Sequence, residues 1–159
     1  MLSAAAERVR SEGLSARARL ALAPMDALPI GDRRIDLIVT HGIWNLAASG
    51  AEFRRAVREA ARVARRGASL FVFTFSRRTL PASERPVAGE SFVFTGFTGT
   101  PQCFVTEAQL LEELGAVGFV PDPAVPLTEH NVPRAGAICA GNVPVIYEAA
   151  FRFGGGGQR

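Results

Sequence analysis

A histidine stands where a buried strand is predicted to end. Residues 35–40 are nearly continuous β-branched and apolar sequence, typical of a strand buried on both faces of a parallel sheet, and His41 and Gly42 follow directly. Open α/β sheets bind ligands at the carboxyl ends of their strands. An imidazole there can accept a proton from a hydroxyl, thiol or amine that reacts. The competing interpretation is a structural histidine, because the sequence shows no partner for His41.

Metal and thiol chemistry is not indicated. The two cysteines, Cys103 and Cys139, lie far apart and match no metal-ligand spacing. We interpret both as reduced structural residues, with a disulfide between them left open, and predict no metal site.

The elements that would position His41 alternate between helix and strand. Helices are predicted over residues 1–12, 51–66 and 106–118, and Gly67 is expected to end the second as a left-handed cap. Strands are predicted over residues 19–23, 35–40, 69–75 and 144–153, with another beginning at Phe119. This order predicts an α/β fold with a mostly parallel sheet. Residues 1–153 are expected to form one domain, and residues 154–159 a flexible glycine-rich tail.

The segment from Ser76 to Val105 is long, rich in proline and glycine, and carries four phenylalanines at 92, 94, 97 and 104. Connections of this length are usually functional covers or contain short strands of their own. Two interpretations follow: a lid over an apolar ligand, or a hairpin packed on the sheet.

Charge and hydropathy exclude some classes of function. All 18 basic residues of the 159 are arginine, and the net charge is +3, too small to indicate a nucleic-acid partner unless the charges cluster. The arginines between residues 54 and 66 form such a cluster, which we interpret as a solvated helix face partly neutralised by Glu52 and Glu59. No apolar run is long enough to span a bilayer, and the first residues do not form a signal peptide. A soluble, cytoplasmic protein with no membrane partner is predicted.

Three stretches resemble the class I S-adenosylmethionine-dependent methyltransferases. Asp26, Leu-Pro-Ile at residues 28–30 and Ile-Asp-Leu-Ile-Val at residues 35–39 resemble an acidic residue, a Leu-Pro run and a strand of that family. Glu59, Arg62-Val63 and Gly67 resemble its Glu-x-x-Arg-Val-Leu-x-Pro-Gly-Gly helix exit. Residues 106–119 resemble its later helix, which is followed by Gly-Phe. Together the stretches cover most of the chain in the family's order.

The resemblance implies a Rossmann-like methyltransferase fold with an antiparallel last strand, and methyl transfer from S-adenosyl-L-methionine to a small-molecule acceptor. Such transfer needs mainly alignment and exclusion of water, so no catalytic dyad is required. The implied cofactor contacts are Met25 on the adenine face, the Asp26 carboxylate, the Ala27 amide, and Thr40, His41 and Gly42 beside the methionine portion. Trp44 and Asn45 would line the acceptor pocket. The competing interpretations are a turn aspartate, a core methionine and a tryptophan that fills space beneath its loop.

Two departures from the family pattern affect these expectations. Arg66 and Ala68 replace the proline and second glycine of the helix exit. No strand followed by a glycine-rich turn precedes residue 19, so the first βαβ portion of the fold is expected to be absent. The edge of the strand at 35–40 would then be unpaired, which predicts marginal stability and a partner chain or dimer that covers it.

The departures also leave alternative functions open. One is impaired activity, and another is a non-catalytic remnant or interaction subunit of a methyltransferase-like assembly. A nucleic-acid methyltransferase is disfavoured, because Thr40-His41-Gly42-Ile43 stands where the Asn-Pro-Pro-aromatic signature of many such enzymes would lie.

Overall fold

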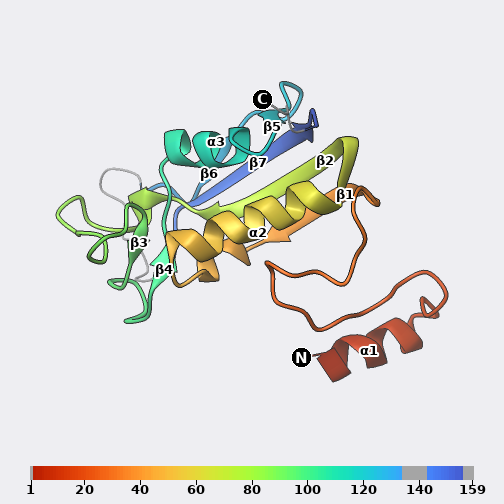
Figure 1. Cartoon of the computed structure of the whole chain (residues 1–159). Coiled ribbons are helices and arrows are strands. Elements are labelled where there is room, and N and C mark those ends of the chain that lie inside the picture. Colours follow the sequence, from red (N-terminus) through yellow and green to blue (C-terminus); the bar gives the residue numbers. More distant parts are fainter. Residues whose placement is uncertain (1, 134–142, 156–159) are drawn as a thin grey trace.

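The computed structural model describes residues 2–133 and 143–155, and its centre is a five-stranded sheet (Figure 1). The main strand order is β1 (Ile35–His41), β2 (Ala64–Phe75), β7 (Ile146–Phe153) and β5 (Phe119–Pro121), and β6 (Thr128–His130) also pairs with β7. β1 is parallel to β2, whereas β7 is antiparallel to β2, β5 and β6. Among the described strands of this sheet, β7 alone therefore runs against the others. The predicted α/β fold, with a mostly parallel sheet and an antiparallel last strand, is confirmed.

Two helices, α2 (Gly50–Val63) and α3 (Glu107–Gly115), cover one face of this sheet (Figure 1). Phe53 and Val57 of α2 and Leu110 of α3 are buried in one core with Leu70 of β2. On the other face, Leu37 and Val39 of β1 are 61% and 58% exposed. The described chain thus covers one face of β1 and leaves the other open.

α2 ends earlier than its sequence predicts. Its last residue is Val63, and Ala64 already has extended backbone at the start of β2. The amides of Arg33 and Arg34 donate hydrogen bonds to the carbonyls of Arg62 and Val63, at 2.9 and 2.8 Å, and so satisfy groups that a helix terminus leaves unpaired. The expected cap at Gly67 is therefore wrong. Gly67 has a φ of +81° inside β2, near the point where the pairing register with β1 shifts.

The amino-terminal region holds one helix but not the predicted strand. α1 (Leu2–Ser11) confirms the first predicted helix, although none of its residues, all described, is buried, and it lies apart from the sheet (Figure 1). The strand expected at residues 19–23 is wrong, because residues 12–34, all described, form no helix or strand. An extended segment becomes a strand only when its backbone pairs, and no described strand pairs with residues 19–23. Leu22 is accordingly 87% exposed.

The phenylalanine-rich segment forms a hairpin. β3 (Val93–Phe94) pairs with β4 (Gln102–Cys103) in an antiparallel two-stranded sheet. Phe94 and Phe104 are buried, with ring centroids 6.2 Å apart, and pack with Leu80, Phe75 and Phe97. The alternative of a packed hairpin is thus the correct one.

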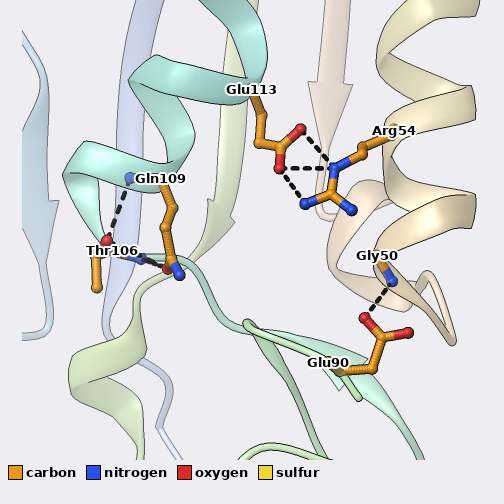
Figure 2. A network of polar contacts seen from close by, with 6 residues as sticks. All are labelled: Gly50, Arg54, Glu90, Thr106, Gln109 and Glu113. Carbon is orange, nitrogen blue, oxygen red and sulfur yellow. Dashed lines mark hydrogen bonds and ion pairs between the residues drawn. The ribbon is translucent and has the colours of Figure 1, made fainter.

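Figure 2 shows the polar contacts that join this hairpin segment and α3 to α2. Glu90 accepts a hydrogen bond from the Gly50 amide at 3.0 Å, at the amino terminus of α2. Arg54 of α2 donates three hydrogen bonds to the Glu113 carboxylate of α3, at 2.6, 2.9 and 3.0 Å. Thr106 and Gln109 form a capping box that begins α3, the helix predicted over residues 106–118. These contacts fix the end of the sheet where β1 and β2 reach their carboxyl termini.

One of the two cysteines can be placed. Cys103 is a free thiol, fully buried, whose sulfur donates a hydrogen bond to the Ala47 carbonyl at 3.4 Å. Burial raises the pKa of the Cys103 thiol to about 12, so the thiolate is disfavoured, as the structural interpretation requires. Cys139 and residues 156–159 of the predicted tail lie outside the described residues.

Candidate functional site

An apolar pocket of about 250 Å³ lies beside the carboxyl-terminal half of β1. Three of the predicted site residues, Met25, Thr40 and Trp44, line it together. They come from three separate segments: the loop before β1, β1 itself, and the 3₁₀ helix η1 (Trp44–Leu46). The remaining lining residues are Ala23, Leu28, Ile38, Val39, Ile43, Ala56 and Ala60.

Local hydrogen bonds and packing hold these three side chains. The Thr40 hydroxyl donates to the Phe71 carbonyl of β2 at 3.4 Å, and Thr40 is buried. Trp44 is also buried, with its ring edge-on to Phe53 of α2 at 5.9 Å between centroids. Met25 packs partly buried against the same core. Both packing interpretations, a core methionine and a tryptophan beneath its loop, are therefore compatible with a pocket wall.

The polar groups predicted to contact adenine already have partners. The Asp26 carboxylate forms an ion pair with Arg55 of α2 at 2.8 Å. The Ala27 amide donates to the Pro24 carbonyl at 3.2 Å, within a turn. A carboxylate has lone pairs for a second donor, whereas the single amide hydrogen of Ala27 would have to exchange its partner. Asp26 is thus the better placed of the two for a ligand.

His41 lies on the other side of β1 from the pocket. Successive side chains of a strand point to opposite faces, so Thr40 faces the helices while His41 faces away from them. The exposed His41 imidazole stacks on the Phe73 ring, with centroids 4.3 Å apart and planes 8° apart. Gly42 then turns the chain with a φ of +67°, and its amide donates to the Phe73 carbonyl at 2.9 Å. The structure therefore separates His41 from Met25, Thr40 and Trp44.

Asn45 has a buried acceptor without a donor. The residue is 2% exposed, and its Oδ1 has no hydrogen-bond partner among the described residues. A Cβ placed on Gly42 would lie 3.7 Å from this oxygen, so the acceptor adjoins the turn that follows β1. An unpaired buried acceptor costs about 1–3 kcal/mol, which a donor from water or a ligand would recover.

A buried carboxylate holds the loop before β1, a role that the sequence analysis missed. Glu59 of α2 accepts a hydrogen bond from the Leu28 amide at 2.6 Å and forms an ion pair with Arg62 at 2.7 Å. Arg62 also donates to Asp32 at 2.6 Å and to the Leu28 carbonyl at 3.3 Å. Hydrogen bonding to Arg62 lowers the pKa of Glu59 against the opposing effect of burial. The available signal was an acidic residue three positions before an arginine, among alanines that face the core.

A larger pocket lies at the carboxyl-terminal end of α2. It has a volume of about 560 Å³ and is lined by Asp32, Arg33, Ala61, Arg62, Arg66, Phe153, Gly154 and Gly155. None of the predicted site residues lines it, and Arg62 is already paired with Asp32 and Glu59. We therefore place the candidate site at the smaller, apolar pocket.

Neither a metal centre nor a membrane span is found in the described part of the chain. Within residues 2–133 and 143–155, no group of three or more His, Cys, Asp and Glu side chains is arranged to hold a metal ion. No helix there is both long and apolar enough to cross a membrane.

Comparisons with known proteins agree on the fold. Residues 1–72 match the family model described as a methyltransferase domain. A crystal structure of an S-adenosylmethionine-dependent methyltransferase from Methanosarcina mazei is similar, with a TM-score of 0.71 and 19% identity over 95% of this chain and 76% of that one. The 1,6-didemethyltoxoflavin-N1-methyltransferase of Burkholderia thailandensis, solved with bound S-adenosylhomocysteine, has a TM-score of 0.66 and 16% identity over 92% of this chain and 56% of its own.

A third similar structure has a different activity. The cyclase SpnF matches with a TM-score of 0.69 and 21% identity over 98% of this chain and 64% of its own. This chain thus spans less than two thirds of the length of two of the three structures. No curated protein sequence matches the chain significantly. The fold is that of the class I S-adenosylmethionine-dependent methyltransferases, and the resemblance predicted from the sequence is confirmed.

Proposed function

We propose that the chain transfers a methyl group from S-adenosylmethionine to a small-molecule acceptor, and that the apolar pocket beside β1 forms part of the cofactor site. The observation that carries the proposal is the convergence of Met25, Thr40 and Trp44, from three segments, on one pocket at the carboxyl end of a strand. Ligands of open α/β sheets bind at this end. The Burkholderia thailandensis neighbour, solved with S-adenosylhomocysteine, supports the choice of cofactor.

The residues present suit this cofactor in three respects. The pocket offers an apolar wall with the Met25 thioether and the Trp44 ring, which favours a flat heteroaromatic group. The Asp26 carboxylate adjoins Met25 and retains free lone pairs for an amino group. The buried Asn45 Oδ1 lacks a donor among the described residues, which favours a ligand carrying one. When bound, the cofactor supplies a methyl group already activated on a sulfonium.

The protein's part in the reaction is then mainly positioning. The pocket residues would orient the ligand and exclude water, which lowers the barrier by fixing the reacting atoms in line. His41 would accept the proton of the acceptor at an imidazole nitrogen, from the exposed side of β1. Trp44 and Asn45 would limit the acceptor to small molecules.

Ion pairs on α2 support a small molecule over a nucleic acid. Arg54 pairs with Glu113, Arg55 with Asp26, and Arg62 with Glu59 and Asp32. Nucleic-acid binding depends on arginines that can neutralise phosphates, and these three have carboxylate partners within the chain.

Titration calorimetry with S-adenosylhomocysteine tests the proposal on the full chain. We expect saturable binding that weakens when Met25→Ala opens the pocket, whereas Val120→Ala, an exposed position on β5, leaves it unchanged. Absence of binding by the wild-type chain, at concentrations where it is folded, would overturn the proposal.

A second candidate is an interaction subunit, and a specific observation favours it. Among the described strands, β1 pairs only with β2, so the backbone of its other edge is unpaired, and the exposed side chains of Leu37 and Val39 add an apolar surface on the open face beside that edge. A partner chain or a second copy over this edge would bury both. A chain that binds S-adenosylhomocysteine while it sediments as a monomer would contradict this candidate.

A further inference from the structure

We infer that Glu59, acting with Arg62, is a positioning residue that holds the loop of residues 24–30 against α2 and so sets the width of the apolar pocket. The identity of the ligand in this inference rests on the proposed function. The arrangement of the pocket walls themselves is independent of it.

The pair holds both backbone polar groups of one pocket residue. The Leu28 amide donates to Glu59 Oε1 at 2.6 Å, and the Leu28 carbonyl accepts from Arg62 Nη2 at 3.3 Å. Leu28 is itself a wall of the pocket. The positions of the loop backbone and of α2 are therefore coupled at a residue that lines the pocket.

The helix side of the contact belongs to the same pocket. Ala56 and Ala60 of α2, three residues before and one residue after Glu59, line the same pocket as Leu28. Glu59 is only 9% exposed, so its carboxylate depends on these partners for the hydrogen bonds that water would otherwise supply. Losing the Leu28 contact would leave the loop without its buried anchor.

The loop has little regular structure of its own. Residues 24–30, all described, contain no helix or strand, and their backbone bonds to each other are the Ala27–Pro24 and Ile30–Leu28 contacts of 3.2 and 2.7 Å. Besides the Glu59 pair, the loop is tied to α2 by the Asp26–Arg55 ion pair, in which Arg55 is half-exposed. Buried hydrogen bonds to charged groups constrain a loop more strongly than exposed ion pairs do.

A structural ion pair elsewhere on α2 provides the matched control. Glu113 of α3 accepts several short hydrogen bonds from Arg54 of α2, but it forms no hydrogen bond with the loop of residues 24–30. E113Q removes one carboxylate charge, as E59Q does, and costs stability without moving a pocket wall. The Gln of E59Q still offers an oxygen to the Leu28 amide, whereas E59A offers none.

The experiment compares E59Q, E59A and E113Q with the wild-type chain in three measurements. The first is acrylamide quenching of the fluorescence of Trp44, the only tryptophan in the sequence, which lines the pocket. The second is the calorimetric affinity for S-adenosylhomocysteine, and the third is the midpoint of thermal unfolding. Quenching reports the pocket wall without any ligand.

We expect E59A to raise quenching of Trp44 and to weaken S-adenosylhomocysteine binding about tenfold, as loss of a hydrogen bond to a charged group would. E59Q should lie between E59A and the wild type, and E113Q should lower the unfolding midpoint while leaving quenching and affinity unchanged. If E59A does not fold, E59Q and R62K carry the comparison, since R62K keeps the charge but loses the forked contact.

Two results separate the inference from the proposed function. If the variants at Glu59 lower stability but match E113Q in quenching and affinity, the pair is only structural and the inference fails. If the wild-type chain does not bind S-adenosylhomocysteine, the proposed function fails, and quenching of Trp44 still decides whether Glu59 positions the loop.

Discussion

The imidazole of His41 stacks on the ring of Phe73, with centroids 4.3 Å apart and planes only 8° apart, on the face of the sheet that α2 and α3 leave open. The neighbouring Thr40 lines the apolar pocket on the other face. Thr40 and His41, which are adjacent in β1, thus point to opposite faces of the sheet. A ligand that contacts both must extend across the carboxyl end of the strand.

Replacing His41 tests its role as a base. His41→Gln removes the proton acceptor, and we expect kcat for methyl transfer to fall about a hundredfold with little change in S-adenosylhomocysteine affinity. Phe73→Leu is the control, because it removes the stacking partner and keeps the imidazole. Equal rates in H41Q and wild type would assign His41 to packing alone.

Breaking the Arg54–Glu113 pair shown in Figure 2 should destabilise the contact between α2 and α3. Because Glu113 is largely buried while Arg54 is half-exposed, we expect E113Q to lower the free energy of unfolding by up to about 1 kcal/mol. Urea denaturation followed by circular dichroism measures the change. E12Q, which breaks the exposed Arg8–Glu12 pair of α1, should have no effect. A similar loss of unfolding free energy in E113Q and E12Q would contradict a specific stabilising role for the Arg54–Glu113 pair.

Acid should weaken the fold partly through Glu59. The hydrogen bond from Arg62, aided by the Leu28 amide, outweighs burial and lowers the pKa of Glu59 below its ordinary value of 4.5. The native state therefore binds this proton less readily than the unfolded state does. The resulting stability is present above pH 4.5 and is lost as the pH falls through the lower native value. The difference in urea midpoint between wild type and E59Q should accordingly be largest near pH 7 and shrink below pH 4. A difference that stays constant with pH would show that the lowered pKa of Glu59 does not contribute to stability.

Charges on the open face of β1 should affect association more than folding. Leu37 is mostly exposed in the single chain and does not line the pocket, so L37E should change the unfolding free energy of a monomer by only about 0.5 kcal/mol. If a partner or second copy covers this edge, the same variant should abolish the larger species in sedimentation velocity. V120E, exposed at the far side of the sheet, is the matched control. Identical sedimentation of all three proteins as monomers would leave no role for this edge in assembly.

The elements that the sequence predicts correctly are those that depend on a few neighbouring residues. Continuous apolar residues predict β1 and the buried part of β2, and the Thr106–Gln109 capping box predicts the start of α3. The arginines and alanines of α2 likewise separate onto different faces of one helix. Each of these signals lies within a few neighbouring residues, so periodicity and capping suffice to find it.

The remaining features depend on partners far away in the chain. The polar segment Thr128–His130 is a strand only because β7 pairs with it, and residues 19–23 are not a strand because no described strand pairs with them. Glu59 meets the Leu28 amide across 31 positions, and this contact has no periodic signature.

By itself, the sequence determined the class of fold and the loops in which chemistry was to be sought. Only the tertiary structure decided which side chains share a pocket, that Thr40 and His41 face opposite ways, and that an anchored loop forms one wall. The reason is that local backbone preference is encoded over a few residues, whereas backbone pairing and the burial of charge are settled only when distant segments meet.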